Sequence, residues 1–507
     1  MIRGLDTNVK KNRRKMFAAI AKLAFEKDRL TADDVEALPY KLCDMDSSED
    51  WGSVYRERAV IRERTRLALG MKLRPENQPV HVSQGIESSD IDEMYYEPPL
   101  MQVIPSACNA CPENLYVVTE QCMGCVAHPC MEVCPRGAIS MVDGKSHIDR
   151  DKCIKCGKCH DACPYDAITH KRRPCADACG VGAIKSDERG RADIDRTLCV
   201  SCGQCMVNCP FGAIADKSQI YQLIKAIRAG KKVIAEIAPA FVGQFGKAEP
   251  EQVKAAIKSL GFYEVYETAL GADIGCVAEA KHYASEVATG ELPFLLTSCC
   301  PSWSFLARLV FPETIENISR TMTPMVATAR VIKKEHPDAQ VVFIGPCASK
   351  KLEAKKRTVR SDVDFVITFE ELMGIFEAKG IEIEGYDETE TIEDATGAGR
   401  GYGVAGGVAG AIEGYIKEHY PDIPVNIVHA EGLAECKKML ALAKAGRMNG
   451  CLIEGMACPG GCVAGAGTLA AIDKGSRKVA EFKAKAKEAL PDENIMDQMD
   501  EEMLKLR

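Results

Sequence analysis

Residues 153–164 read Cys-Ile-Lys-Cys-Gly-Lys-Cys-His-Asp-Ala-Cys-Pro, and residues 199–210 repeat the pattern as Cys-Val-Ser-Cys-Gly-Gln-Cys-Met-Val-Asn-Cys-Pro. In both stretches two residues separate each of the first three cysteines, and a fourth cysteine follows after three more residues, directly before a proline. Thiolates at this spacing wrap a 4Fe-4S cluster, and the fourth cysteine ligates the neighbouring cluster of a pair. The sequence therefore predicts paired iron-sulfur clusters that carry electrons.

Working outward, a third and slightly stretched copy of the pattern precedes the first, and the hexamers CPRGAI, CPYDAI, CGVGAI and CPFGAI close four copies in all. Zinc ribbons also use C-x2-C pairs, but the repeated spacing before proline favours a cubane. The first bacterial-ferredoxin-like unit is thus predicted to hold one cluster on Cys122, Cys125, Cys130 and Cys163. Its second cluster is predicted on Cys134, Cys153, Cys156 and Cys159.

The second unit is incomplete, because no C-x-x-C lies directly upstream of Cys175-x3-Cys179. One cluster is still predicted there, on Cys179, Cys199, Cys202 and Cys205. The remaining cysteines, together with the unassigned Cys-Asn-Ala-Cys upstream, predict a fourth cluster on Cys108, Cys111, Cys175 and Cys209. The alternative is a set of unpaired thiols or a lost site, so we expect three to four accessory clusters.

Composition narrows the class of protein. The chain has 507 residues, 46% hydrophobic and 27% charged, with a formal net charge of -8, which argues against a nucleic-acid partner. Sixteen of the 25 cysteines fall between Cys108 and Cys209, which favours metal ligation over disulfides. No apolar run is long enough for a membrane span. The arginines within Asn12–Phe17 resemble a twin-arginine export signal, but Lys22 interrupts the apolar stretch that follows, so we expect a cytoplasmic protein.

The pattern along the chain predicts a multidomain α+β protein. Helical stretches are expected near 13–27 and 54–70, buried strands near 232–238 and 341–344, and further helices near 250–260 and 322–335. The expected parts are a helical accessory region (1–105), a ferredoxin-like multi-cluster domain (106–215), an α/β catalytic domain (216–475) and a helical tail (476–507).

Three further cysteine-bearing loops lie in the α/β domain, each after an apolar run that could be a strand. They are Thr297-Ser-Cys-Cys-Pro-Ser-Trp303, Gly345-Pro-Cys-Ala-Ser-Lys-Lys-Leu-Glu353 and Glu454-Gly-Met-Ala-Cys-Pro-Gly-Gly-Cys462. Residues at adjacent strand ends of one sheet would share a site. Four thiolates would come from Cys300, Cys347, Cys458 and Cys462, leaving Cys299 free.

These loops resemble the three signature motifs of FeFe hydrogenases, over roughly residues 230–470, with departures that resemble the group B branch. The resemblance implies an H-cluster, which is a 4Fe-4S cubane joined through Cys462 to a diiron subsite with CO, cyanide and an azadithiolate bridge. The four thiolates above would hold the cubane, and Lys350 would hydrogen-bond a cyanide. Met456, Pro239 and Tyr402 would also lie at the diiron pocket.

Heterolysis of dihydrogen needs an open Lewis-acidic metal, a base, a proton relay and an electron exit. By resemblance, Cys299 would be the first relay group, and a thiol suits this role because its pKa can approach neutrality. Further relay positions would be Glu279, Ser319 and Glu353. His282 stands where the family has a glutamate, which predicts a different pH dependence because imidazole titrates near neutrality. Gly345, Met325 and Gly465–Thr468 depart from the prototypes as well and leave the rate open.

The resemblance implies a ferredoxin-type hydrogenase that reversibly reduces protons to dihydrogen, with a ferredoxin or similar carrier and diiron-maturation proteins as partners. Two alternatives are a non-catalytic relative that assembles iron-sulfur proteins and a redox-sensing subunit. Gly401-Tyr-Gly-Val-Ala-Gly406 matches a dinucleotide motif formally, but no clear strand precedes it, so a turn near the diiron site is the better interpretation. Cys276, Cys436 and Cys451 are expected to be buried thiols.

Overall fold

A computed structural model describes residues 4–43, 52–90, 96, 98–356, 358–359, 362–387 and 390–499. Its first part is helical, as expected, but holds one helix more than the sequence analysis placed there. The helices are α1 (Asn8–Glu26), α2 (Ala32–Leu42) and α3 (Val54–Ala68). The additional helix α2 begins at a capping box in which Thr31 and Asp34 bond each other's backbone N–H groups. Helix α1 packs on the main body, where buried Arg13 pairs with Glu370 at 2.6 Å.

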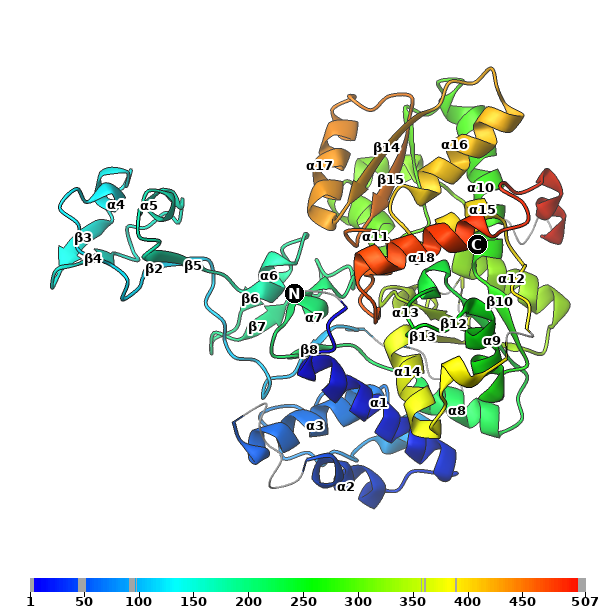
Figure 1. The fold of residues 1–507 in the computed structure, drawn as a ribbon, viewed down its shortest axis with the longest axis horizontal. Helices are drawn as coiled ribbons and strands as arrows, with labels where there is room; N and C mark the ends of the chain where they lie inside the picture. The colour runs from blue at the N-terminus through cyan, green and yellow to red at the C-terminus, as the bar shows by residue number, and fades with distance from the viewer. Residues whose placement is uncertain are drawn as a thin grey trace.

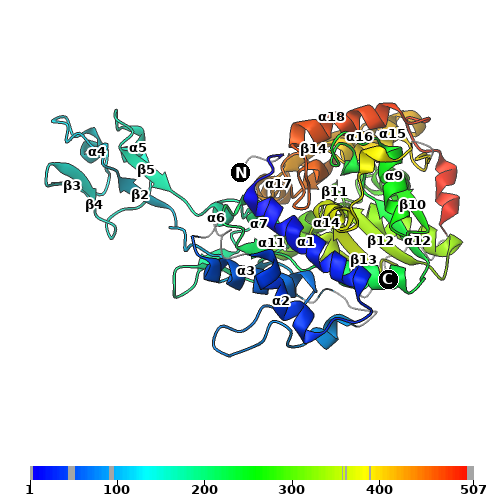
Figure 2. The same cartoon turned by 60° about the horizontal axis from the view of Figure 1, so that its bottom comes forward.

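The first ferredoxin-like unit projects from the body as an arm, which Figures 1 and 2 both show. Strands β2 (Leu115–Val118) and β5 (Ile168–Lys171) pair antiparallel at its base, with Leu115 opposite Lys171. Farther out lie the hairpin of β3 (Ile139–Val142) and β4 (Lys145–Ile148) and the short helices α4 (Pro129–Glu132) and α5 (Lys158–Asp161). The arm therefore leaves the body and returns to it at one place.

The second unit lies between the arm and the body. It contains the short helices α6 (Pro174–Asp177) and α7 (Gln204–Asn208) and the strands β6 (Ile184–Ser186), β7 (Ala192–Ile194) and β8 (Ile214–Ala215). Strand β8 pairs with β1 (Gln102–Val103), which belongs to the part of the chain expected to be the helical accessory region. The first two expected domains thus share a strand pair.

The body is an α/β domain with two parallel sheets. The four-stranded sheet has the order β10-β9-β12-β13, from β9 (Val233–Ile237), β10 (Glu264–Glu267), β12 (Gln340–Gly345) and β13 (Phe365–Thr368). The three-stranded sheet has the order β11-β15-β14, from β11 (Phe294–Leu296), β14 (Asn426–Glu431) and β15 (Cys451–Met456). The expected strands near 232–238 and 341–344 are confirmed, and both are fully buried in the main apolar core.

Helices cover both sheets, and those expected near 250–260 and 322–335 are confirmed. They are α8 (Ile220–Arg228), α9 (Pro250–Ser259), α10 (Ala269–His282), α11 (Pro301–Val310), α12 (Pro324–Glu335), α13 (Lys350–Glu353), α14 (Phe369–Lys379), α15 (Gly397–Gly401), α16 (Gly407–His419), α17 (Leu433–Lys444) and α18 (Ile472–Ala484). The C-terminal helix begins before residue 476 and ends at Ala484, and residues 500–507 of the expected tail lie outside the described residues. Among the described helices, none has the length and apolarity to cross a membrane.

The arrangement of the three cysteine loops corrects one expectation. The loops after β11 and β15 share the three-stranded sheet, whereas the loop after β12 belongs to the four-stranded sheet. Adjacent ends of one sheet were expected, and this is wrong. The site lies instead where the carboxyl ends of two parallel sheets face each other, which is still the end at which α/β proteins bind ligands.

Candidate iron-sulfur and active site

In the arm, the structure brings together the cysteines predicted to share the second cluster. A small cavity of about 20 Å³ is lined by Cys134, Cys153, Cys156 and Cys159. The cavity is also bordered by Ile139 and Ile148, both buried. Cys156 is exposed, so one side of this cavity faces the solvent.

The other predicted site of the arm is organised around Ser146. Its backbone N–H points to the sulfur of Cys122 at 3.5 Å, and its hydroxyl lies 3.3 Å from the sulfur of buried Cys130. Cys163 packs against the same apolar cluster as Cys130. Among these cysteines the hydrogen bonds lower the pKa of Cys122, with the Ser146 N–H as the largest cause. Such N–H donors stabilise a thiolate ligand.

The Ala-Ile pair that ends each of the four hexamers, here called the Ala-Ile repeat, has a structural role. The alanine N–H of the repeat donates to the sulfur of the preceding cysteine in three copies, at 3.3 Å for Cys134, 3.2 Å for Cys179 and 3.3 Å for Cys209. Hydrogen bonds to cysteine sulfurs are one of the factors that set cluster potentials. In three of its four copies the repeat therefore places one N–H donor on the cysteine that closes the pattern.

In the second unit, the structure gathers the four cysteines of the uncertain cluster. Burial, and after it Cys209, Cys108 and Cys111, raise the pKa of Cys175 to about 12. Arg173 fixes this arrangement, since its guanidinium donates to the carbonyl of Cys111 at 2.8 Å. The chain thus returns from the arm to the point from which it left. Cys108 and Cys111, which precede the arm, therefore lie near Cys175 and Cys209, which follow it.

The remaining quartet of the second unit lies between this group and the body. Burial, followed by Cys202, Cys199, Cys179 and Cys175, raises the pKa of Cys205 well above its ordinary value. Burial raises the pKa of Cys202 to about 12, and Cys300 is among the thiols that add to the effect. The Cys175 group (Cys108, Cys111, Cys175 and Cys209) therefore lies next to the Cys205 group (Cys179, Cys199, Cys202 and Cys205). The Cys205 group in turn lies next to the first cysteine loop of the body.

The second unit packs directly on the cysteine loops of the body. The side-chain amide of Gln204 donates to the sulfur of Cys458 at 3.1 Å, and the hydroxyl of Ser302 donates to the carbonyl of Val200 at 3.0 Å. Gly203 has a φ of +75°, and a Cβ at this position would lie 2.5 Å from the Cβ of Ala466. Only glycine allows this close approach between the two parts.

Within the body, hydrogen bonds hold the three cysteine loops in register. Thr297 donates its N–H to Ile453 at 3.0 Å, and Gly467 donates its N–H to Pro346 at 2.9 Å. Burial, and then Cys347 and Cys300, raise the pKa of Cys462 to about 12. Three of the four expected thiolates thus converge, and the fourth, on Cys458, lies in the same loop as Cys462.

The expected relay groups also come together. The carboxylate of buried Glu279 accepts from the N–H and hydroxyl of Ser298 at 3.1 and 3.2 Å, and Ser319 donates to it as well. Burial raises the pKa of Glu279 to about 7. Burial, and then Glu279, raise the pKa of Cys299 well above its ordinary value, so the expectation of a thiol pKa near neutrality is wrong. A neutral thiol can still pass a proton by donating at one side and accepting at the other.

His282 follows Glu279 by one helical turn and is paired with a new carboxylate. Its Nε2 atom lies 3.3 Å from Glu286, where α10 passes into a π-helical turn at Tyr283–Val287. Such turns occur frequently at functional sites. Glu286 therefore supplies, one turn later, an acidic group at the outer end of the expected path.

Lys350 lies at the opposite side of the site. Its ammonium is buried and pairs with Glu353 at 2.7 Å, and the charge of Glu353, together with that of the Cys347 thiolate, outweighs burial and raises the pKa of Lys350. Buried Glu236 on β9 also faces this charge, and burial raises its pKa well above the ordinary range. Lys350 is therefore held as a cation between carboxyl groups and the cysteine loops.

The other expected residues surround the same space. Met456 is buried at the end of β15, and Pro239 is buried in the turn after β9. Tyr402 is buried near Cys299 and Glu279, and its hydroxyl has no hydrogen-bond partner among the described residues. An unpartnered buried hydroxyl beside converging thiols fits a site that holds a further polar group.

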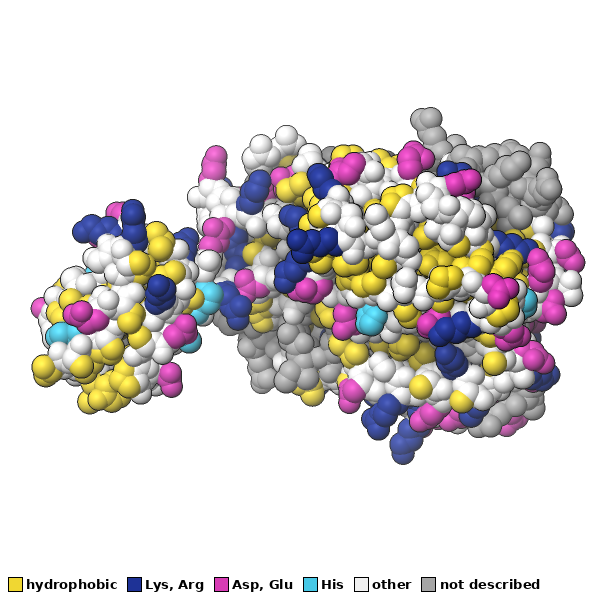
Figure 3. Space-filling model, turned by 90° about the horizontal axis from the view of Figure 1, so that it is seen from above, with side chains coloured by type: hydrophobic (Ala, Val, Ile, Leu, Met, Phe, Trp, Pro, Cys, Tyr) yellow, Lys and Arg dark blue, Asp and Glu magenta, His cyan; other side chains and the backbone are white. Residues whose placement is uncertain are grey.

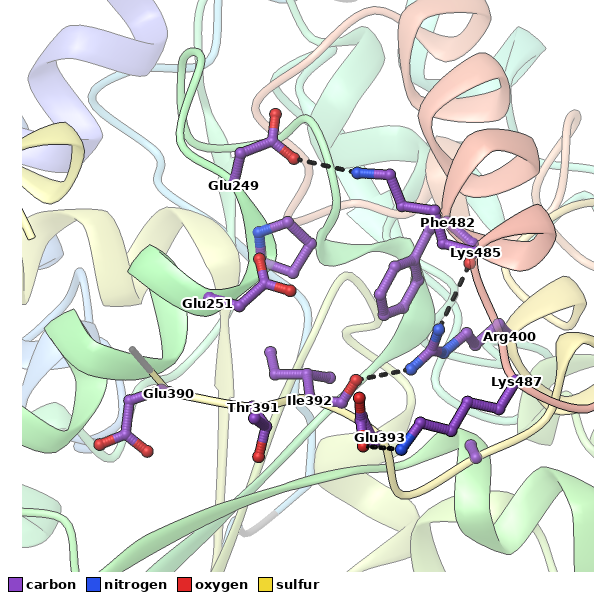
Figure 4. Close-up of a pocket in the computed structure, with 12 residues that line it drawn as sticks. Glu249, Glu251, Glu390, Thr391, Ile392, Glu393, Arg400, Phe482, Lys485 and Lys487 are labelled. Carbon is purple, nitrogen blue, oxygen red and sulfur yellow. Dashed lines mark hydrogen bonds and ion pairs between the residues drawn. The ribbon is translucent and has the colours of Figure 1, made fainter. Parts of the chain in front are cut away.

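The glycine-rich turn before α16 is part of this wall. Buried Glu454 accepts from the N–H groups of Gly406 and Ala409 at 2.9 and 2.7 Å. On its other side Arg400 donates to the carbonyl of Ile392 at 2.8 Å, and both residues line a separate cavity of about 470 Å³. Figure 4 shows the residues of this lining. The turn follows the helix α15 and not a strand, which agrees with rejecting a dinucleotide site.

Sequence reasoning missed several residues that the structure adds. Gln204 lies inside a ferredoxin motif and Glu454 opens the third cysteine loop, but neither is a ligand position, so their roles are found only by their contacts. Lys351 stands beside Lys350 in the motif, yet its fully buried ammonium pairs with Asp216 at 2.8 Å and Glu371 at 3.0 Å. Cys276 and Cys436 are buried as expected, whereas Cys451 is only partly buried.

The donor sets fit the groups they would hold. The sixteen cysteines of the ferredoxin-like units form no disulfide and are available for the four predicted quartets. The cysteine loops of the body meet a lysine, a free thiol and an unpartnered hydroxyl, which suits a cubane with an attached polar subsite. Across the described residues, no three His, Cys, Asp or Glu side chains converge as they would around a single metal ion.

Comparisons with known proteins agree with this geometry. Residues 231–466 match the family model described as iron only hydrogenase large subunit, C-terminal domain, and residues 146–169 and 191–214 match 4Fe-4S binding domains. Iron hydrogenase 1 of Clostridium pasteurianum is 28% identical over 387 residues, which cover 66% of this chain and 67% of the relative.

Two further comparisons cover the body. The periplasmic Fe hydrogenase large subunit of Nitratidesulfovibrio vulgaris is 28% identical over 50% of this chain and 72% of its own. A solved FeFe-hydrogenase HydA1 variant from Chlamydomonas reinhardtii aligns at 23% identity over 54% of this chain and 91% of its own, with a TM-score of 0.46. Residues 231–466 therefore form a domain of the iron-only hydrogenase large-subunit family, and two 4Fe-4S binding domains precede it.

Proposed function

We propose that this protein is an FeFe hydrogenase that interconverts protons and electrons with dihydrogen, using electrons from a ferredoxin-type carrier. The observation that carries the proposal is the convergence of a free thiol, Cys299, and a buried ammonium, Lys350, on the cysteine loops of the body. An electron-transfer module needs neither group. The four-part division at residues 105, 215 and 475 and membership of the group B branch are part of the same proposal.

Different residues of this chain would have different roles at the site. Cys300, Cys347, Cys458 and Cys462 would hold a cubane, and the attached diiron group would supply the open metal position at which dihydrogen is split or formed. Lys350 would donate a hydrogen bond to an anionic ligand, and it is suited to this because Glu353 keeps it charged at 2.7 Å. Buried Met456, Pro239 and Tyr402 would exclude water from the pocket.

Protons would travel along the groups that line up behind Cys299. Its neutral thiol would exchange a proton with the pocket and with Glu279, whose pKa of about 7 lets it bind and release protons under ordinary conditions. Ser319 donates to Glu279, and the pair of His282 and Glu286 stands at the outer end. The histidine would thus extend the path without breaking it.

Electrons would pass through the ferredoxin-like units. The contacts from the Cys175 group to the Cys205 group and on to Cys300 provide a continuous order of cysteine ligands. We propose four accessory 4Fe-4S clusters, held by the four quartets that the sequence spacing defines. The chain of clusters that would carry electrons and the groups that would carry protons reach the site from different sides.

The test is to express the chain with diiron-maturation proteins and to record infrared spectra and hydrogen evolution with reduced ferredoxin. Bands of metal-bound CO and cyanide and a measurable rate are expected, and Cys299→Ser should lose most of the rate while keeping the bands. Cys451→Ser serves as the matched thiol control, because Cys451 lies at the start of β15 and outside every quartet. Matured protein without these bands contradicts the proposal and leaves the non-catalytic assembly protein as the better assignment.

A further inference from the structure

The arm carries the most solvent-exposed cysteine of the predicted clusters. Cys156 is classed as exposed, whereas the other cysteines of the described residues are buried or partly buried. It lines the small cavity of this cluster site together with Ile154, which is 56% exposed, and Lys158. An electron carrier could therefore approach this cluster site more closely than any other, and electron transfer between proteins requires such an approach.

The surface around Cys156 has a charge opposite to that of the whole protein. Residues 150–158 contain four cations and one carboxylate, Asp151, whereas the chain carries a formal net charge of -8. Figure 3 shows Lys and Arg side chains gathered on one side of the arm. The four cations of this segment are Arg150, Lys152, Lys155 and Lys158.

Three of these cations are available for a partner. Lys152 pairs with Asp149 at 3.4 Å, but Arg150, Lys155 and Lys158 form no ion pair with any described residue. The nearby acid Asp161 lies 2.9 Å from the ring of His160. Lys155 is presented by a backbone with a φ of +58°, directly next to Cys156. The loop thus holds two unpaired ammonium groups and an exposed isoleucine at the rim of one cluster site.

We propose that this face of the arm, formed by residues 150–158, is the docking site of a small acidic one-electron carrier, and that electrons enter at the cluster held by Cys134, Cys153, Cys156 and Cys159. The inference rests on the proposed function and adds the place and the charge of the contact. In the step, the carrier loses one electron and the cluster gains it, with no bond made or broken. A short apolar contact inside a cationic rim is typical of weak electron-transfer complexes, which bury little surface and are steered by charge.

The positive charge of this face favours an acidic carrier as its partner. In a contact between two copies of this chain, the same cationic loop would face itself and the two loops would repel each other. An acidic carrier would be attracted to the loop. The apolar end of the arm, with Met123 at 69% and Val126 at 94% exposure, offers a rival point of contact without a charge signal. The experiment therefore includes both surfaces.

The experiment uses the full chain with its clusters and an acidic bacterial-type ferredoxin carrying two 4Fe-4S clusters. Stopped-flow absorbance follows reduction of the protein's clusters by the reduced ferredoxin in material lacking the diiron group. Lys155→Glu/Lys158→Glu should slow this reduction about tenfold at low salt and flatten its dependence on ionic strength. Reduction by methyl viologen, which needs no docking site, should keep its wild-type rate.

The controls separate the possible failures. Lys41→Glu/Lys437→Glu makes the same change in net charge at exposed lysines away from the arm and should behave as wild type. Equal slowing in this control, or no slowing in the loop variant, overturns the proposal. Slowing in Met123→Ser/Val126→Ser alone overturns it in favour of the apolar end. Because the diiron group is absent, none of these results depends on hydrogenase activity, so failure of the proposed function is seen separately.

Discussion

The two adjacent lysines of the second cysteine loop allow a sharp test, because they point to different partners. Lys351 is fully buried, and its ammonium donates to Asp216, Glu371 and the carbonyl of Lys217 at 2.8, 3.0 and 2.7 Å. All three of its donor positions are therefore used. Replacing Lys351 by methionine would leave two buried carboxylates without their cation.

The cost can be worked from this geometry. Removing one partner from a buried ion pair costs about 3–5 kcal/mol. Unfolding entropy is roughly 2.1 cal/mol/K per residue, or about 0.5 kcal/mol/K for a cooperative unit of roughly 260 residues such as 216–475. Lys351→Met should therefore lower the melting temperature by about 6–9 °C.

The assay is calorimetric melting at a fixed scan rate, on protein carrying its iron-sulfur clusters, together with hydrogen evolution at 25 °C. Lys351→Met should melt early but keep most of its activity per folded molecule. Lys350→Met, whose partner is Glu353 at the site, should lose activity instead. A melting temperature for Lys351→Met within 2 °C of wild type would refute the reasoning, and so would equal loss of activity in the two variants.

Three other outcomes are expected. Cys175→Ser should lower bound iron by about four atoms per chain while Cys451→Ser does not, and unchanged iron would remove the fourth accessory cluster. The carboxyl of Glu279 is neutral below its pKa of about 7 and charged above it, so hydrogen oxidation should rise with pH through that value and Glu279→Gln should abolish the inflection. An inflection that persists in the variant assigns the titration to another group. Gln204→Leu should lower the potential of the body's cubane by roughly 30–60 mV in a spectroscopic redox titration, since one hydrogen bond to sulfur is lost. An unchanged potential would mean that this contact does not tune the cluster.

The sequence predicted the strands and helices of the body well because their apolar runs are long and end at clear boundaries. Both parallel strands near 232–238 and 341–344 formed as expected. Helix α2 was missed because Ala32–Leu42 is short and contains Pro39. The split into two sheets could not be read from the chain, because the strand order depends on pairing between residues more than a hundred positions apart.

At the site, residues with a fixed spacing were predictable and residues that act through contacts were not. Cys347 and Cys462 stand in recognisable loops, whereas Gln204 reaches Cys458 from 254 positions away. The raised pKa of Cys299 could not be predicted either, because a sequence does not show that this thiol is buried. Adjacent Lys350 and Lys351 look equivalent until their partners are known.

The closed base of the arm has a consequence for how this chain is built. Leu115 and Lys171 are register partners, so the arm starts and ends at one point, between Cys111 and Cys175. Joining those two ends in thought gives C-x2-C, six residues and then C-x3-C, which is a stretched ferredoxin motif interrupted by another ferredoxin. With the proposed ligand sets, the second unit would be complete but split, and the first one would be nested inside it. A variant that lacks residues 115–171 should keep the cysteine groups of the second unit and the hydrogenase domain. It would be a shorter protein with one continuous ferredoxin-like unit.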